Sequence, residues 1–152
     1  YSFAPNPLVV VAPQDHPLVG QRNISIDEIA KHPFIERESG SGTRDAVRRM
    51  FSEMGPLPKI KMELGSNEAI KHAVVAGLGL AVMSLHSLTL DGPKGPLALL
   101  NVEGFPIMRQ WYIVHPKGKE LSLIAQAFLD YALEAVPEKR QKMIDNWPML
   151  EF

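Results

Sequence analysis

The chain has 152 residues, of which 45% are hydrophobic and 22% are charged, proportions typical of a folded globular protein and unlike those of disordered chains. Its 16 Lys and Arg nearly balance 17 Asp and Glu, and the net charge of −1 argues against a general electrostatic attraction to nucleic acid or to anionic membranes. Cysteine is absent, which excludes disulfides, thiolate nucleophiles and cysteine-ligated metals, and no apolar stretch approaches the ~20 residues that span a bilayer.

The first part of the chain alternates strand and helix patterns. An apolar, β-branched run between prolines predicts a buried strand at residues 7–13. Ser25 is a candidate N-cap for a short helix that ends before Pro33, and a strand is expected at residues 34–38. A serine–glycine loop follows, and apolar residues at helical spacing then predict a helix from Thr43 to Met54.

The same alternation continues beyond Gly55. Apolar residues at every second position predict a half-buried strand at residues 59–65, and Ser66 is expected to cap a helix that stops at Gly77. A second buried strand is predicted at residues 79–84, and further strands at 92–100 and 107–115. On the last strand, Trp111 and Tyr112 are expected to lie in the core. The strand–helix alternation predicts an α/β sheet that is at least partly parallel.

The C-terminal part is predicted to be an amphipathic helix at residues 121–136, followed by a polar tail that ends in an aromatic stretch at residues 147–152. The helix positions expected to face inward are Leu121, Ile124, Ala125, Phe128, Leu129 and Ala132.

Two strand ends that run into helix N-termini are the candidate binding elements. The loop from Ser39 to Thr43 lets a partner approach its backbone, and a helix N-terminus attracts anions and carbonyl groups. The segment that begins Ser66-Asn67 has the same form, and ligands of open α/β sheets collect at the carboxyl ends of strands. A plain strand-to-helix turn with serine caps is the competing interpretation of both.

Enzymatic chemistry finds no support in the sequence. The loop lacks the Gly-Lys-Ser/Thr of a nucleotide-binding loop and the spacing of a nucleophile elbow, and the five histidines show no zinc-binding spacing. No catalytic and no metal-binding residues are therefore predicted. The charged residues around the loop are expected on solvated faces: Glu36, Glu38, Asp45, Arg44, Arg48 and Arg49. For Arg44, in the first turn of the helix, a position that reaches the binding cleft stays open as an alternative.

Several stretches of the chain resemble the effector-binding domain of LysR-type transcriptional regulators. They are NPLVVVAPQDHPL (residues 6–18), PFIERESGSGTR (33–44), MELGSNEAIKHAVVAGLGLAVMS (62–84) and WYIVHPKGKELSLIAQAFLDY (111–131). The resemblance runs from about Pro5 to Val136. GSNEAIKHAV and NVEGFPIMRQWYIVH are similar to the branch of the family that regulates carbon-fixation (RuBisCO) operons.

The resemblance implies an α/β, periplasmic-binding-protein-like (type II) fold of two lobes joined by a hinge. Residues 1–13 are then the end of lobe I with the first hinge segment, and residues 14–106 are the complete lobe II. Residues 107–136 are the second hinge segment with the C-terminal part of lobe I, and 137–152 are a tail. Pro13 and Ile107 are the implied hinge residues.

The resemblance also implies a cytoplasmic sensor that binds a small, anionic metabolite between the lobes, without enzymatic activity, cofactor or membrane contact. The ligand-binding residues carried over to lobe II are Ser39, Gly40, Ser41, Thr43, Ser66 and Asn67. DNA is expected to contact only an N-terminal helix-turn-helix domain outside this chain, and a homodimer or homotetramer is expected. Two alternatives stay open: a stand-alone periplasmic solute-binding protein of the same fold, and a hydrolase that uses Ser41.

Overall fold

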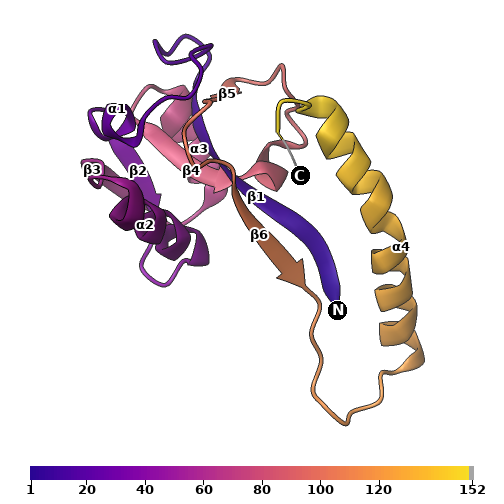
Figure 1. Ribbon diagram of the computed structural model, residues 1–152. Coiled ribbons are helices and arrows are strands. Elements are labelled where there is room, and N and C mark those ends of the chain that lie inside the picture. The colour runs from indigo at the N-terminus through magenta and orange to yellow at the C-terminus, as the bar shows by residue number, and fades with distance from the viewer. Residues whose placement is uncertain (151–152) are drawn as a thin grey trace. The chain divides into compact units, whose positions relative to one another are not determined.

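The computed structural model describes residues 1–150 and divides the chain into two compact units (Figure 1). Unit 2 is the continuous segment Pro7–Ile107, and unit 1 combines residues 1–6 with the chain from Met108 onward. The boundaries implied by the resemblance, at residues 13/14 and 106/107, stay a prediction. Each unit is described by itself below.

The sheet of unit 2 has the strand order β3-β2-β4-β1-β5. Its strands are β1 (Ser2–Pro13), β2 (Phe34–Arg37), β3 (Ile60–Leu64), β4 (Leu80–Ser84) and β5 (Leu97–Leu99). β2 pairs in parallel with β3 and β4, whereas β1 runs antiparallel to β4 and β5. The predicted α/β class with a partly parallel sheet is therefore confirmed.

The helices of unit 2 begin at serine caps. They are α1 (Ile26–Ala30), α2 (Gly42–Met54), α3 (Asn67–Val75) and the 3₁₀ helix η1 (Leu85–Leu88). The hydroxyls of Ser25, Ser41, Ser66 and Ser84 each accept a backbone N–H of the first turn, which gives one otherwise unpaired donor a partner. The sequence predicted the caps Ser25 and Ser66, a serine or threonine cap of α2 was the competing interpretation of its loop, and η1 was not expected.

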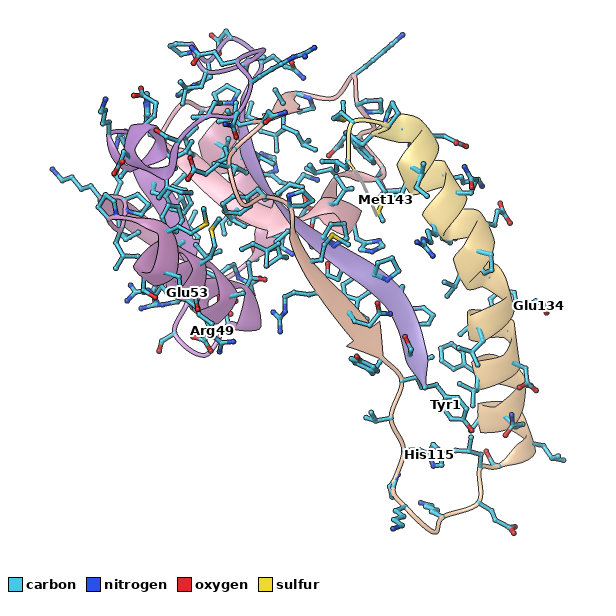
Figure 2. The ribbon with its side chains drawn as sticks, viewed as in Figure 1. Tyr1, Arg49, Glu53, His115, Glu134 and Met143 are labelled. Carbon is cyan, nitrogen blue, oxygen red and sulfur yellow. The ribbon has the colours of Figure 1, made fainter. Side chains whose placement is uncertain are left out.

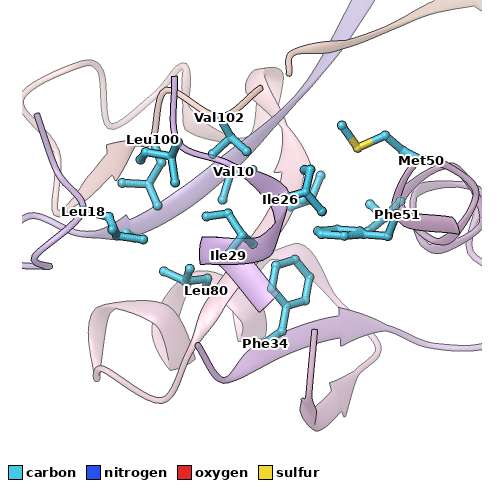
Figure 3. Close-up of a cluster of buried hydrophobic side chains, with 14 of the residues drawn as sticks. Val10, Leu18, Ile26, Ile29, Phe34, Met50, Phe51, Leu80, Leu100 and Val102 are labelled. Atoms are coloured by element: carbon cyan, nitrogen blue, oxygen red, sulfur yellow. The ribbon is translucent and has the colours of Figure 1, made fainter. Parts of the chain in front are cut away.

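The core of unit 2 lies between the sheet and α1 and α2 (Figure 3). Phe34 of β2 and Phe51 of α2 meet edge to face, with ring centroids 5.9 Å apart, and both are almost fully buried. Val10 of β1 and Leu80 of β4 extend the same cluster along the sheet. This packing holds α2 against β2, and so sets where the loop between them lies.

Unit 1 contains the start of β1, the strand β6 (Ile107–Tyr112) from Met108 onward, and the helix α4 (Leu123–Asn146). Tyr1 and Ile113 exchange both backbone hydrogen bonds, each 2.9 Å long, which is the reciprocal pattern of an antiparallel pair. The Tyr1 ring also stacks on His115, with centroids 6.1 Å apart (Figure 2).

Several residues of unit 1 are more exposed than the sequence predicts. Trp111 and Tyr112 are 40% and 65% exposed, so their assignment to the core is wrong. On α4, Leu129 and Ala132 are buried as expected, but Ile124 and Phe128 are 84% and 66% exposed. The apolar periodicity correctly predicts an amphipathic helix, and the exposure arises because unit 1 supplies little structure for that face to pack on.

The helix α4 also extends beyond its predicted end at residue 136. It continues through Pro137 to Asn146, and Met143 and Trp147 are each only 2% exposed. Burial of these two side chains gives the last turns a packing energy that offsets the cost of an internal proline. Of the aromatic stretch at 147–152, residues 151 and 152 lie outside the described part of the chain. In residues 1–150, no helix has the length and hydropathy required to cross a bilayer.

Candidate ligand-binding site

The two candidate binding elements lie at the same edge of the unit 2 sheet. β2 and β3 are parallel neighbours, and their last residues, Arg37 and Leu64, are register partners. The chain leaves both strands at this point and enters α2 and α3 after short turns. The order of the strands thus places the helix N-termini side by side, at the edge where α/β sheets bind ligands.

The predicted ligand-binding residues differ in how they are placed. Ser39, Gly40 and Ser66 are exposed, Thr43 and Asn67 are half-buried, and Ser41 is buried. The Ser41 hydroxyl accepts the Arg44 N–H at 3.4 Å, and the Ser66 hydroxyl accepts the Ala69 N–H at 3.1 Å. Ser41 and Ser66 therefore have structural roles as caps. Their role in binding a ligand stays a prediction.

Gly40 gives the loop a backbone shape that other residues adopt with difficulty. Its φ angle is +90°, and a Cβ built on it would have no neighbour within 4 Å. Glycine is thus required by the backbone conformation and not by a neighbouring atom. The loop is open on the side that this missing Cβ would face.

Arg37, which the sequence did not suggest as a site residue, lies across this edge. Its Nε and Nη2 donate to the two Glu38 carboxylate oxygens at 2.8 and 2.9 Å, and its Nη1 donates to Asn67 Oδ1 at 3.0 Å. The hydrogen bond to Glu38 raises the pKa of Arg37, and the bond from Arg37, followed by that from Glu38's own backbone amide, lowers the pKa of Glu38. An adjacent Arg-Glu pair at the end of a strand was the available sequence signal.

Asn67 connects Arg37 to the far side of the same edge. While its Oδ1 accepts from Arg37, its Nδ2 donates to the Ser87 hydroxyl of η1 at 3.1 Å. Lys71, one turn further along α3, donates to the Ser87 carbonyl at 3.2 Å and pairs with Asp91 at 2.8 Å. Both functional groups of the Asn67 amide are thus held inside the protein, and Asn67 fixes the position of the Arg37 guanidinium.

A second ion-pair cluster fixes α2 on the strands. Glu36 of β2 is buried, and its carboxylate accepts from Arg48 at 2.7 and 3.1 Å. Arg44 pairs with Glu63 of β3 at 2.6 Å and donates to the Arg37 carbonyl at 3.2 Å. The expected placement of Glu36 on a solvated face is therefore wrong, because α2 packs over it and its charge is paired there. Of the three arginines of α2, Arg44 is turned toward the strands, the alternative that the sequence left open for it.

The other predicted positions lie away from this edge. Ile107 is the last residue of unit 2, and Pro13 lies inside unit 2 at the end of β1, so their role as hinges stays a prediction. Unit 1 has a shallow hollow of about 540 Å³ beside the N-terminus of α4, which contains none of the predicted ligand-binding residues. Within residues 1–150, no group of three His, Cys, Asp or Glu side chains could hold a metal ion.

Comparison with known proteins gives a consistent set of relatives. The model of the LysR substrate binding domain matches residues 2–137. The HTH-type transcriptional activator CmpR of Synechocystis sp. is 54% identical over 129 residues, which are 85% of this chain and 42% of that protein. The RuBisCO operon transcriptional regulator of Allochromatium vinosum is 51% identical over 132 residues, or 87% of this chain and 44% of that protein. The chain thus spans less than half of the length of these relatives.

Solved structures agree with the sequence relatives. The Synechocystis PCC6803 CcmR regulatory domain, in complex with 2-PG, matches with a TM-score of 0.84 and 46% identity, over 90% of this chain and 65% of that one. The effector binding domain of QuiR, in complex with shikimate, matches with a TM-score of 0.73 and 25% identity, over 90% of this chain and 64% of that one.

Proposed function

Because the chain belongs to the family of LysR substrate binding domains, we propose that it senses a small anionic metabolite for a transcriptional regulator, and that it is a binding module and not an enzyme. Its α/β fold is that of LysR effector-binding domains, which are of the periplasmic-binding-protein-like type II. The relatives that match most of its length regulate transcription, and those named above include a RuBisCO operon regulator.

The observation that supports an anionic ligand is the pair of helix N-termini at one edge of the unit 2 sheet together with an arginine. α2 and α3 begin at this edge, and the Arg37 guanidinium donates to Asn67, the first residue of α3. Helix N-termini and a guanidinium both favour carboxylate and phosphate groups. The 2-PG complex of the CcmR regulatory domain is in keeping with such a ligand.

The remaining parts of the function follow from the same relatives. We expect binding to shift a conformational equilibrium that a DNA-binding domain outside this chain detects. Several of the relatives are named HTH-type regulators, and this chain spans 42% of CmpR, so DNA contact is assigned to the part not represented here. We further propose that the protein uses no cofactor. We propose that it forms a homodimer or homotetramer and is located in the cytoplasm.

Calorimetric titration of the chain with 2-PG tests this proposal. Thr43→Ala and Ser66→Ala should each weaken binding by roughly tenfold or more if the residue donates a hydrogen bond to a charged ligand. Ser66→Ala should also lower the free energy of unfolding by about 1 kcal/mol, because it removes the cap of α3.

Ser52→Ala provides a matched control, since Ser52 is an exposed serine near the other end of α2 whose hydroxyl donates to the Arg49 carbonyl at 2.7 Å. It should bind the ligand as the unmodified chain does. Equal affinities for the Thr43, Ser66 and Ser52 variants would show that the first two residues only cap or line the helices. Operator-specific DNA binding by this chain alone, seen in a gel shift, would contradict the assignment of DNA contact to another part of the protein.

A further inference from the structure

The Arg37–Glu38 pair has the geometry of a ligand-binding arginine whose position is occupied by an internal carboxylate. Arg37 uses the Nε and Nη2 side of its guanidinium for the two Glu38 oxygens, at 2.8 and 2.9 Å. A carboxylate or phosphate ligand forms the same kind of two-donor pair with an arginine. Glu38 therefore stands where an anionic ligand would bind.

The two partners of this pair are held very differently. Arg37 is only 20% exposed in its side chain and is also fixed by its third contact, to Asn67, which is itself held by Ser87. The Glu38 side chain is 41% exposed. Glu38 can thus rotate into water, where its charge is solvated, while the guanidinium keeps its place.

The neighbouring arginine pair shows the opposite arrangement. In the Arg48–Glu36 pair the acid is 8% exposed in its side chain and the arginine 44%. Glu36 is buried on the strand, and departure of Arg48 would leave its carboxylate with only the longer contact to Arg44, at 3.6 Å. The contrast marks Glu36–Arg48 as a structural pair and Arg37–Glu38 as a pair that can open.

The energetics permit the exchange. Water and salt screen the exposed Glu38 carboxylate, so this pair contributes less net stability than a fully buried one. An anion with two acceptor oxygens replaces both hydrogen bonds and adds contacts that Glu38 lacks. The free energy lost when Glu38 leaves is therefore small relative to that gained from the ligand.

We propose that Arg37 is the anion-binding residue of this site and that Glu38 is an internal counter-ion, which the anionic effector displaces when it binds. The proposal rests on the proposed function, since it describes how that ligand reaches its site. Glu38 then lowers the affinity for every anion, and only a ligand with further contacts to the loop overcomes this competition. The pair thereby selects against simple inorganic anions at cellular concentrations.

Titration of the chain and three variants with 2-PG, and separately with inorganic phosphate, tests the proposal. Glu38→Gln should bind both probes more tightly, by up to about fivefold. It removes the carboxylate that competes with the probe for Arg37, and an ion pair with a solvent-exposed partner contributes little net free energy. Arg37→Gln should bind each probe about tenfold or more weakly, because it removes a charge-assisted pair of hydrogen bonds.

Glu68→Gln is the matched control for the loss of one negative charge. Glu68 lies in the first turn of α3, next to Asn67, and pairs with Lys71, which keeps its second partner Asp91. Glu68→Gln therefore removes one negative charge, as Glu38→Gln does, but leaves the partner of Arg37 in place. We expect the affinity of Glu68→Gln for both probes to rise less than that of Glu38→Gln. Thermal unfolding followed by circular dichroism establishes that all variants fold.

The outcomes separate this inference from the proposed function. Equal affinities for Glu38→Gln and Glu68→Gln would show that only net charge matters, and weaker binding by Glu38→Gln would show that Glu38 orients Arg37 instead of competing for it. Either result would overturn the inference about Glu38. The proposed function would still stand in that case, provided that the unmodified chain binds 2-PG. Absence of binding to 2-PG and phosphate by the chain and all variants would overturn the proposed function and this inference together.

Discussion

Gly79 is a position where the close approach of two strand starts can be tested with one methyl group. A Cβ built on Gly79 would lie 2.8 Å from the Pro33 carbonyl oxygen and 3.1 Å from its carbon. A Cβ within 3.0 Å of a backbone atom is essentially never seen in folded proteins, so one of the two segments would have to move. The same carbonyl accepts the Leu80 N–H at 2.9 Å, which joins the starts of β2 and β4.

Gly79→Ala should lower the free energy of unfolding by about 2–4 kcal/mol. Weakening the Leu80–Pro33 hydrogen bond contributes about 0.5–1.5 kcal/mol, and forcing an extra methyl against a packed core contributes about 1–3 kcal/mol. Phe34 and Leu80, which flank the contact, are each 1% exposed, so the strain has little room to relax.

Urea denaturation of Gly79→Ala and Gly65→Ala, followed by circular dichroism, measures this difference. Gly65 also lies between a strand and a helix, but a Cβ there has no neighbour within 4 Å and its φ angle is not positive. Its substitution should leave stability unchanged to within about 0.5 kcal/mol, or raise it slightly by restricting the unfolded chain. Equal stabilities of the two variants would refute the close approach at Gly79.

Two further predictions concern pH and assembly. Burial, and next the neighbouring His32, lower the pKa of His16 despite the nearby Asp15. The unfolded chain therefore binds more protons, and stability should be constant above the ordinary histidine pKa of about 6.5 and fall as pH drops below it. Urea midpoints at several pH values measure this loss of stability, and His16→Gln should make the midpoint less dependent on pH. An unchanged pH dependence in His16→Gln would assign the loss to other groups. The exposed apolar face of α4, which includes Ile124 and Phe128, predicts a dimer or larger species at micromolar concentration. Light scattering measures this, Phe128→Glu should weaken the association, and a monomer at all concentrations would contradict it.

The local architecture of unit 2 could be predicted from the sequence because its signals are local. Ser25, Ser41 or Thr43, and Ser66 mark helix starts by residues that bond to the next turn of their own chain. The alternation of Ile60, Met62 and Leu64 similarly identifies a strand from its own side chains. Since strands and helices alternate, the two helix N-termini were also expected at one sheet edge, as the register of β2 and β3 shows.

The sequence was less informative about which charged and apolar side chains are covered, because burial depends on segments far away in the chain. Glu36 looked like a solvated strand residue, and it is buried because α2 brings Arg48 over it. Trp111 looked like core, and it is 40% exposed.

The arrangement of Arg37, Glu38 and Asn67 likewise required the tertiary structure. Arg37 and Asn67 are 30 residues apart, and the parallel pairing of β2 and β3 brings their side chains within 3.0 Å. The sequence by itself thus determined most helices and strands of unit 2, the family and the sheet edge. The orientation of each charge at that edge was decided by the tertiary structure, because a guanidinium or carboxylate takes its direction from partners that only folding brings into reach.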